Sequence, residues 1–424
     1  MKVLVVGSGG REHSICWSIK KSPKVSEVFC APGNAGIASI VQTLDIDANN
    51  LNGLLDFALK EKIDLTIVGP EQPLSIGIVD LFRDNGLLIF GPNMHSSQLE
   101  SSKEFSKIFM KRNHIPTANF ESFSDFDKAL DYVRHSAYPL VVKADGLAAG
   151  KGVRVCNKID EAEEFLKFVM QDKIFSASGD RVVIEEFLEG EEASFFVFTD
   201  GESILPLDSS QDHKRLLDND LGPNTGGMGA YSPAPIVDEQ TRNNIMKDVV
   251  TPVFQGFKKD KIDYTGVLYI GLMIKDKKSR VVEFNCRFGD PETQPLLYRL
   301  KSDAFNLFYM TASGDLARYK LEWKNTSSVT VVMAADGYPG KYKAGAPIIG
   351  LEDFTKENVT IFHAGTNNVD GKMVINGGRV LGVTAEAPSL KAAISIVYDA
   401  ISDIDSSNLI YRKDIGKKGL LKIS

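Results

Sequence analysis

Short apolar runs alternate with helical patterns through residues 1–100 of the chain. Helical patterns such as 51–60 and 76–85 lie between the runs. The apolar runs are each bounded by Gly, Pro or Asn and cover 3–6, 25–30, 63–68 and 87–90. This order of elements is typical of an open parallel sheet covered by helices, and ligands of such sheets bind at the carboxyl ends of the strands. We therefore expect an N-terminal open parallel αβα domain.

The middle of the chain predicts smaller and more antiparallel units. A single helix is expected from Ser96 or Ser97 towards Arg112. Residues 140–187 then indicate a small mixed unit, and strands linked by tight turns follow from Ala193. After about residue 325, several strands and one helix predict a C-terminal mixed domain. The fold class is thus α/β followed by α+β.

Bulk composition excludes several classes of protein. With 424 residues the chain is too long for one core. A formal charge of -7 argues against a general nucleic-acid binder. Four scattered cysteines suggest neither a zinc site nor a disulfide framework, and a reducing compartment fits. Met1 leads directly into the strand 2–6, and no apolar run is long enough to span a bilayer, so we expect a cytoplasmic protein without a membrane partner.

The strand beginning at Val281 carries the most specific chemistry. Successive side chains of a strand point to opposite faces, so Glu283, Asn285 and Arg287 share one face while Val282 lies on the other with Phe284. A carboxylate and an amide oxygen suit a hard metal ion such as Mg2+ or Mn2+, with ATP oxygens and water completing the shell. The alternative is a polar face of the sheet that is exposed to water.

Two glycine-rich loops predict phosphate contacts. Residues 7–12 resemble a dinucleotide fingerprint, but Glu12 replaces its third glycine, opposes close helix–strand packing and would repel a pyrophosphate. A smaller substrate phosphate held by backbone N–H groups, with Arg11 assisting, is the functional interpretation. The second loop, 143–153, lacks the Walker A order but places small residues between two lysines. For each loop the alternative is a turn without a ligand.

Two further segments are less specific. Residues 182–192 form a strand that runs into acids, which indicates either an adenosine site or a solvated acidic hairpin. Residues 209–235 form a long irregular segment, and such segments are usually functional. Met228 and Tyr231 suggest an ordered wall rather than a disordered loop. His213 could be a structural histidine, so no proton transfer is assigned to it.

Together these motifs resemble the phosphoribosylamine–glycine ligase family (glycinamide ribonucleotide synthetases) within the ATP-grasp superfamily. The resemblance runs nearly from end to end, and the set in this order is highly specific. Its motifs are GSGGREH at 7–13, APGNAG at 31–36, VGPE at 68–71, KADGLAAGKGV at 143–153, SQDHKR at 210–215, NTGGMGAYSP at 224–233 and EFNCRFGDPETQ at 283–294.

The resemblance implies four units and one reaction. The units are a Rossmann-like substrate domain at 1–100, a linker helix with the ATP-grasp lid at 101–192, the catalytic core at 193–325 and the C-terminal domain at 326–424. The implied reaction joins glycine to 5-phosphoribosylamine with ATP, giving glycinamide ribonucleotide, ADP and phosphate in de novo purine (IMP) biosynthesis. The resemblance also suggests a monomer.

The resemblance further implies roles for individual residues. Glu283 and Asn285 would be the metal ligands, and Lys143 and Arg287 the catalytic residues. ATP would be held by Lys103, Lys143, Gly150, Lys151, Gly152, Glu185, Glu186, Phe187, Leu188 and Glu191. The substrate pocket would be lined by Gly10, Arg11, Glu12, Gly33, Asn34, Asp212, Lys214, Thr225, Gly226, Gly227, Met228, Gly229 and Arg287.

The implied mechanism needs no protein nucleophile. The glycine carboxylate would attack the γ-phosphate of ATP to give glycyl phosphate, which the ribosylamine nitrogen then attacks. Lys143 and Arg287 would offset developing charge, and Arg287 would also grip the glycine carboxylate. The loop 146–152 would close over ATP and exclude water. One departure from the superfamily is that the strand 266–274 offers no second metal carboxylate.

Three rival functions remain open from the sequence. A biotin-dependent carboxylase subunit would have a similar grasp fold but would use bicarbonate. A nicotinamide oxidoreductase built on the first domain is opposed by Glu12. A non-catalytic nucleotide sensor is opposed by the intact pair of Glu283 and Asn285.

Overall fold

The first domain is a five-stranded parallel sheet, as expected. The computed structural model describes residues 1–148, 152–351 and 354–423. The strand order is β3-β2-β1-β4-β5, and every pairing is parallel. Its strands are β1 (Lys2–Gly7), β2 (Glu27–Pro32), β3 (Gln42–Thr43), β4 (Leu65–Val68) and β5 (Ile89–Phe90). Its main helices are α1 (Gly10–Ile19), α2 (Ala35–Ala38), α3 (Leu51–Glu61), α4 (Glu71–Ser75) and α5 (Ile78–Asp84).

Both faces of this sheet are buried. Alternate residues of β1 belong to two different apolar clusters, Leu4 and Val6 to one and Val3 and Val5 to the other. A strand that buries both faces must be apolar throughout, which explains the unbroken run in the sequence. The carboxyl ends of β1 and β4 therefore carry their polar loops at one edge of a rigid sheet.

The linker between the first domain and the lid is broken, and the expectation of a single helix is wrong. Helix α6 (Gln98–Ser101) and helix α7 (Lys103–Arg112) are separated by Ser102, whose backbone is extended (φ -135°, ψ 113°). The Ser102 hydroxyl accepts from Phe105 N at 3.1 Å and so caps α7. Asp145 of the lid accepts from Glu104 N at 2.8 Å. The break thus ties the start of α7 to the lid.

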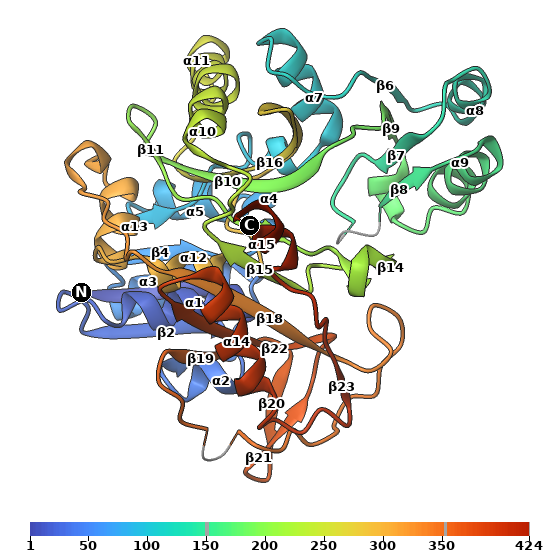
Figure 1. The fold of residues 1–424 in the computed structure, drawn as a ribbon. Coiled ribbons are helices and arrows are strands. Elements are labelled where there is room, and N and C mark those ends of the chain that lie inside the picture. Colours follow the sequence, from blue (N-terminus) through green and yellow to red (C-terminus); the bar gives the residue numbers. More distant parts are fainter. Residues whose placement is uncertain (149–151, 352–353, 424) are drawn as a thin grey trace.

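The lid is a separate antiparallel sheet with its own apolar cluster. Its strand order is β6-β9-β7-β8, and it extends away from the other sheets (Figure 1). The strands are β6 (Phe120–Phe123), β7 (Leu140–Ala144), β8 (Val153–Cys156) and β9 (Val182–Glu186). Two helices pack against it, α8 (Phe126–Arg134) and α9 (Ile159–Leu166).

The catalytic core is a four-stranded antiparallel sheet in the order β11-β10-β16-β17. Its strands are β10 (Glu191–Thr199), β11 (Ile204–Pro206), β16 (Gly266–Lys275) and β17 (Lys278–Asn285). Helices α10 (Glu239–Ile245) and α11 (Thr251–Asp260) follow one another through a π-turn at Met246–Val250.

A β-bulge lies next to the chemistry of β17. Gly271 pairs with Glu283 whereas Leu272 pairs with Val281, so Val282 is the extra residue. As a result Val281 and Phe284 both enter the core and Val282 stays half-buried. The expectation that Val282 shares the core face with Phe284 is therefore wrong, because strict alternation fails at a bulge.

The C-terminal sheet takes strands from both sides of residue 326. Strands β12 (Gln211–Asp212) and β15 (Gly229–Ser232) come from the segment expected to be irregular, and β15 pairs with β18 (Ser327–Ala335). The sheet continues through β22 (Arg379–Ala387) to β19 (Val359–His363), with β23 (Leu409–Ile410) on β18 and α14 (Leu390–Ile401) against it. Between β12 and β15 a small hairpin forms from β13 (Arg215–Leu217) and β14 (Leu221–Asn224).

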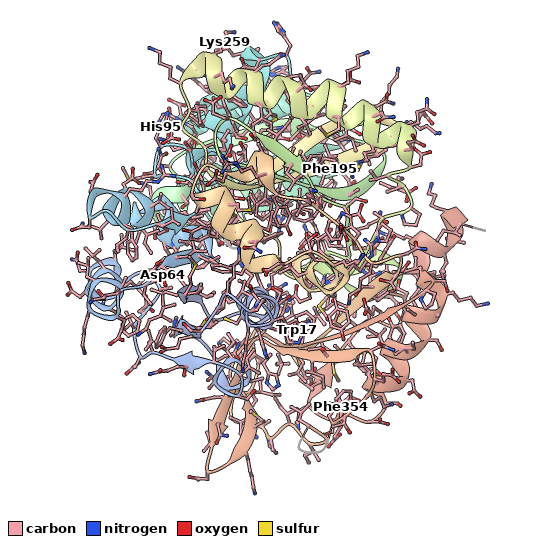
Figure 2. All side chains as sticks on the ribbon, turned by 90° about the vertical axis from the view of Figure 1, so that its left-hand side faces the viewer. Trp17, Asp64, His95, Phe195, Lys259 and Phe354 are labelled. Carbon is pink, nitrogen blue, oxygen red and sulfur yellow. The ribbon has the colours of Figure 1, made fainter. Side chains whose placement is uncertain are left out.

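The first and C-terminal domains meet through α1. His13 Nδ1 accepts from His363 N at 2.8 Å. The Trp17 ring meets the Phe362 ring of β19 edge to face with centroids 5.5 Å apart, where the N-terminal and C-terminal ribbons meet (Figure 2). Burial lowers the pKa of His13 to about 3 and that of His363 to about 4, so both rings are neutral at pH 7. Among the described residues, no helix combines the length and apolar character needed to cross a membrane.

Acid should weaken this interface through His13. An unfolded histidine titrates near pH 6.5, whereas folded His13 stays neutral down to about pH 3. The unfolded state therefore binds more protons in this range, and the free energy of unfolding decreases as the pH is lowered from 6.5 to about 3. From pH 7 to pH 5 the loss from this one group is about 2 kcal/mol. His13→Asn should reduce that pH-dependent loss by about the same amount, measured by urea unfolding with Trp17 fluorescence. The exposed His135→Asn is the control; an unchanged pH dependence in His13→Asn would contradict the prediction.

Candidate functional site

Glu283 is a half-buried carboxylate surrounded by lysines. Its Oε1 lies 3.9 Å from Lys214 Nζ. Burial alone would raise the pKa of Glu283, but Lys214, Lys143 and Lys103 bring it below its ordinary value. Glu283 is therefore ionised, and Asn285 is buried two positions along the strand. Together they supply two hard oxygen donors of the kind that Mg2+ or Mn2+ takes.

The described residues offer no larger metal cluster. Among them, no group of three or more His, Cys, Asp and Glu side chains is arranged to hold an ion. A metal at Glu283 and Asn285 would thus need oxygen ligands from a bound substrate, which suits an ion delivered with a nucleotide.

Lys143 is fixed by a buried ion network. Its Nζ lies 2.9 Å from Glu185 Oε1 and donates to Val282 O, the carbonyl of the bulge residue, at 3.4 Å. The other oxygen of Glu185 lies 3.0 Å from Lys107 Nζ. Glu185 therefore positions two lysines instead of presenting a free carboxylate to a ligand. Lys107, one turn after Lys103 on α7, is absent from the residues expected from the sequence.

The residues expected at the ATP hinge have several partners. Glu186 is paired with Arg280 and accepts from Asn119 N at 2.9 Å. The Phe187 side chain is exposed, and Leu188 beside it is half-buried. Glu191 lies 2.7 Å from Lys422 of the C-terminal helix α15 (Lys417–Ile423). Gly150 and Lys151 lie outside the described residues, whereas Gly152 is described and directly precedes β8.

Lys214 lies between Glu283 of the expected metal pair and the segment 212–229, which was expected to line the substrate pocket and is called the substrate wall below. It lies 2.9 Å from Glu192 Oε2 as well as near Glu283. Its carbonyl accepts from Thr225 N and Thr225 Oγ1, at 2.8 and 2.9 Å. Asp212 is buried on the same face, and burial raises the pKa of its carboxyl. His213 points to the other face and burial lowers its pKa to about 3, which fits a structural role.

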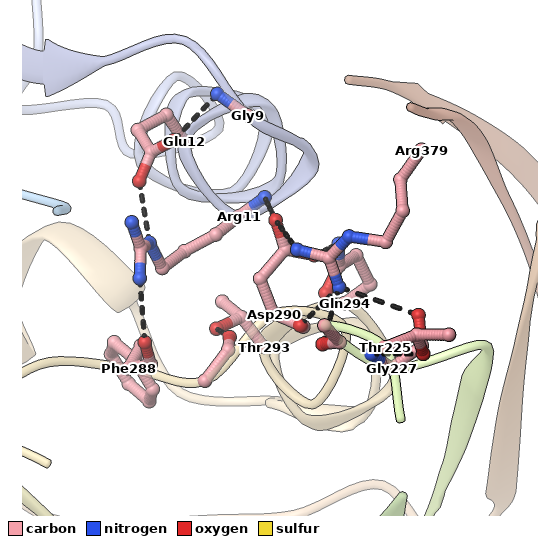
Figure 3. A network of polar contacts seen from close by, with 12 residues as sticks. Gly9, Arg11, Glu12, Thr225, Gly227, Phe288, Asp290, Thr293, Gln294 and Arg379 are labelled. Carbon is pink, nitrogen blue, oxygen red and sulfur yellow. Dashed lines mark hydrogen bonds and ion pairs between the residues drawn. The ribbon is translucent and has the colours of Figure 1, made fainter. Parts of the chain in front are cut away.

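The start of α1 uses Glu12 as a cap. Glu12 Oε2 accepts from Gly9 N at 2.6 Å, and its Oε1 accepts from Arg11 Nε at 2.5 Å (Figure 3). A Cβ at Gly7 would lie 2.5 Å from Glu12 Cγ, and one at Gly69 would also collide with this side chain. The expectation that Glu12 opposes close packing is wrong, because two other glycines make room for it. The carboxylate stabilises the turn.

The chain's own carboxylates occupy part of the expected phosphate turn. Arg11 N donates to Asp290 Oδ2 at 3.4 Å, and the Arg11 guanidinium donates to Phe288 O at 3.0 Å. A Cβ at Gly10 would lie 2.7 Å from Gln294 Nε2. Asn34 donates to Ser8 O and to His363 O at 2.7 and 2.9 Å. Gly33, just before it, donates its N–H to Gly7 O at 3.0 Å. These expected substrate residues thus also tie the first domain to the loop after β17 and to β19.

Arg287 is held by two acids that sequence reasoning missed. Its Nη2 lies 2.6 Å from Glu100 Oε1, and its Nε lies 3.3 Å from Glu71 Oε2. Glu100 is buried and also accepts from Cys286 N at 2.7 Å, whereas Glu71 is partly exposed. Glu71 is the last residue of the VGPE motif after β4. That motif indicated a site in the sequence, but it did not indicate that Glu71 pairs with Arg287. Arg287 is pre-oriented on the face of Glu283.

The substrate wall is completed by a residue of the C-terminal sheet. Arg379 Nη1 donates to Gly226 O at 2.7 Å, to Gly227 O at 3.4 Å and to Asp290 O at 2.5 Å (Figure 3). Met228 is fully buried, and Gly229 accepts from His213 N at 2.9 Å. A lone arginine at the start of a strand carries no motif, so nothing in the sequence indicated Arg379.

Taken together, the geometry favours phosphate chemistry. The hard oxygen pair lies among lysines from the linker helix, the lid and the substrate wall. Burial raises the pKa of the nearby Cys286 thiol, so it is not poised as a nucleophile. The arrangement can neutralise phosphate charge and orient two substrates, which is how phosphoryl transfer is catalysed.

Comparison with known proteins agrees with this geometry. Three domains of phosphoribosylglycinamide synthetase match the chain: the N domain over residues 1–100, the ATP-grasp (A) domain over 101–293 and the C domain over 328–418. The phosphoribosylamine–glycine ligase of Vibrio parahaemolyticus is 48% identical over 425 residues, covering 100% of this chain and 99% of that protein. The Escherichia coli ligase is 49% identical and covers 99% of both chains.

Solved structures give the same result. The crystal structure of phosphoribosylamine–glycine ligase from Thermotoga maritima has a TM-score of 0.86 at 33% identity, covering 98% of this chain and 100% of that chain. The biotin carboxylase domain of Hydrogenobacter thermophilus 2-oxoglutarate carboxylase, in complex with MgADP and bicarbonate, has a TM-score of 0.76 at 17% identity. It covers 97% of this chain and 91% of that domain, and at this identity it shows a shared fold alone.

Proposed function

The chain belongs to the phosphoribosylamine–glycine ligase family of ATP-grasp enzymes, and we propose that the site around Glu283 and Lys143 joins glycine to 5-phosphoribosylamine. The protein is a ligase of purine biosynthesis that uses ATP with Mg2+ or Mn2+. The proposal rests on the oxygen donors of Glu283 and Asn285, which lie among lysines. The chain that carries them matches this family in all three of its domains.

Glu283 and Asn285 are our proposed metal ligands. An ion held by these two residues would offset the charge of the ATP phosphates. Lys143, held by Glu185, and Lys103 would contact the phosphates from the lid and from α7. Burial lowers the pKa of Lys103, with Lys143 adding to the effect and Glu283 opposing it, so a bound polyphosphate would strengthen its charged form. Gly150, Lys151 and Gly152 would cover the phosphates.

The adenosine end would lie at the hinge after β9. Glu186, Phe187 and Leu188 would present backbone groups to the adenine edge. Glu191 would accept ribose hydroxyls, in which case it would exchange its pairing with Lys422 for the ligand. This places the nucleotide between the lid and the catalytic core, which are linked by the same hinge.

Glycine activation is the step in which Arg287 acts. A carboxylate is a poor acylating agent, and its phosphorylation supplies a good leaving group. In our proposal the glycine carboxylate approaches a free edge of the Arg287 guanidinium, attacks the γ-phosphate and forms glycyl phosphate with release of ADP. The ribosylamine nitrogen then attacks the carbonyl carbon, its C–O bond to phosphate breaks, and the amine loses a proton. Glu71 and Glu100 keep Arg287 in place throughout.

The second substrate would lie on the wall formed by Gly10, Arg11, Gly33, Asn34, Asp212, Lys214 and residues 225–229. We also propose the four functional units at 1–100, 101–192, 193–325 and 326–424. The enzyme would act as a monomer in the cytoplasm, on small molecules. Its four free, buried cysteines suit a reducing compartment, and its charge of -7 gives no general affinity for nucleic acid.

Substrate dependence tests the function directly. ADP release should require glycine and phosphoribosylamine together, the latter formed in place from ribose 5-phosphate and ammonia. Bicarbonate with biotin should give no ADP above background. The reverse pattern would establish the carboxylase function instead.

Removal of the proposed metal carboxylate should abolish catalysis and leave the fold intact. Glu283→Ala is expected to reduce turnover by at least about 100-fold, because it removes the charged metal ligand that orients ATP. Circular dichroism and the melting temperature should stay near those of the unaltered enzyme. Glu239→Ala, on the surface of α10, is the control. Near-normal turnover of Glu283→Ala would reject the assignment.

Isotope transfer tests the acyl phosphate. If glycine attacks the γ-phosphate, one carboxylate oxygen leaves with phosphate when the amide bond forms. Glycine labelled with oxygen-18 in its carboxylate should therefore deliver label to the released phosphate, as detected by mass spectrometry or by the isotope shift in phosphorus NMR. Unlabelled phosphate would exclude this route.

A further inference from the structure

One turn of the substrate wall is held from both sides by the C-terminal domain. Gly226 N donates to the Tyr338 hydroxyl at 2.9 Å, and Gly226 O accepts from Arg379 Nη1 at 2.7 Å. Tyr338 lies in the turn after β18, and Arg379 begins β22. A Cβ at Gly378 would collide with the Tyr338 ring, so the backbone beside Arg379 lies directly against Tyr338.

Arg379 also contacts the loop that follows Glu283, Asn285 and Arg287 in the chain. Its Nη1 donates to Asp290 O at 2.5 Å, and its Nη2 lies 3.4 Å from Asp290 Oδ2. The turn and this loop are in direct contact, because a Cβ at Gly227 (φ +114°) would collide with Pro291. One guanidinium therefore ties the wall turn to the segment that carries Arg287 (Figure 3).

Asp290 extends the connection to the first domain. Its Oδ2 accepts from Arg11 N at 3.4 Å, and its Oδ1 accepts from Gln294 Nε2 at 2.8 Å. Arg379 thus fixes the mutual placement of three segments that we assign to the substrate side: the start of α1, the turn at 225–229 and the loop after Arg287. The lysines assigned to ATP lie on other elements, Lys103 on α7 and Lys143 on β7.

We propose that Arg379, supported by Tyr338, is a positioning residue for phosphoribosylamine, through which the C-terminal domain sets the substrate side of the site. The inference rests on the proposed assignment of residues 225–229 to this substrate. A planar guanidinium can serve three carbonyls and a carboxylate in fixed directions, whereas a lysine retains only the charge. The geometry, and not the charge alone, should therefore be needed.

Steady-state kinetics of full-length variants test the proposal. Arg379→Ala should raise KM for phosphoribosylamine about tenfold or more, since it removes charge-assisted hydrogen bonds, while KM for ATP stays within about twofold. Arg379→Lys should restore little. Tyr338→Phe, which deletes one hydroxyl, should raise the same KM by about threefold, and the effects of the two sites should be non-additive because both act on Gly226.

Two further variants make the result decisive. Lys356→Ala breaks ion pairs to Asp399 and Asp403 in the same domain and should change no KM. Thr225→Ala perturbs the turn itself and should raise KM for phosphoribosylamine. Tyr338→Phe removes only one hydroxyl, so its KM for phosphoribosylamine still tests the proposal if Arg379→Ala does not fold.

Three outcomes would overturn the proposal. If Thr225→Ala raises KM for phosphoribosylamine while the Arg379 and Tyr338 variants leave it unchanged, the positioning role fails and the substrate wall stands. If all of these variants leave it unchanged, the assignment of the wall itself fails. If the Arg379 variants raise KM for ATP equally, or if Lys356→Ala behaves like them, the domain acts by general stabilisation.

Discussion

The catalytic side of this protein depends on the lysines that keep one half-buried carboxylate ionised. Desolvation alone would raise the pKa of Glu283, and a neutral acid is a poor ligand for a hard cation. The lysines that prevent this come from α7, β7 and the segment after β12, which belong to separate parts of the fold. The assembled fold therefore brings lysines from three parts of the chain to one carboxylate, and the same lysines are then available to a polyphosphate.

Periodic patterns in the sequence predicted the strand and the sheet that surround the candidate site. The alternation of β17 placed Glu283, Asn285 and Arg287 on one face, and the hydrophobic runs of residues 1–100 gave the parallel sheet. Both features depend on the period of a single element. The bulge at Val282 could not be predicted in this way, because it depends on how β17 pairs with Gly271 of another strand.

The partners of the expected residues were much harder to predict. Glu71 and Glu100 hold Arg287 across long sequence separations, and Arg379 reaches the wall from the last domain. Glu12 was judged by its own size, whereas its environment is set by Gly7 and Gly69. The short strands β12 and β15 have too few residues for a pattern of their own and owe their existence to β18. Each of these failures concerns a contact that only the tertiary fold creates.

The sharing of one sheet between the core and the C-terminal domain has a consequence for biosynthesis on the ribosome. Ser232 of β15 pairs with Ser328 of β18, so one edge of β15, whose other edge pairs with β12, has no partner until much later residues have left the exit tunnel. The parallel sheet and the lid, whose strands all pair within their own segments, can be completed earlier. A nascent chain would thus display these completed sheets with an unfinished edge beside them. Ribosome pauses between these two strands would prolong the exposure of that edge to chaperones or to another copy.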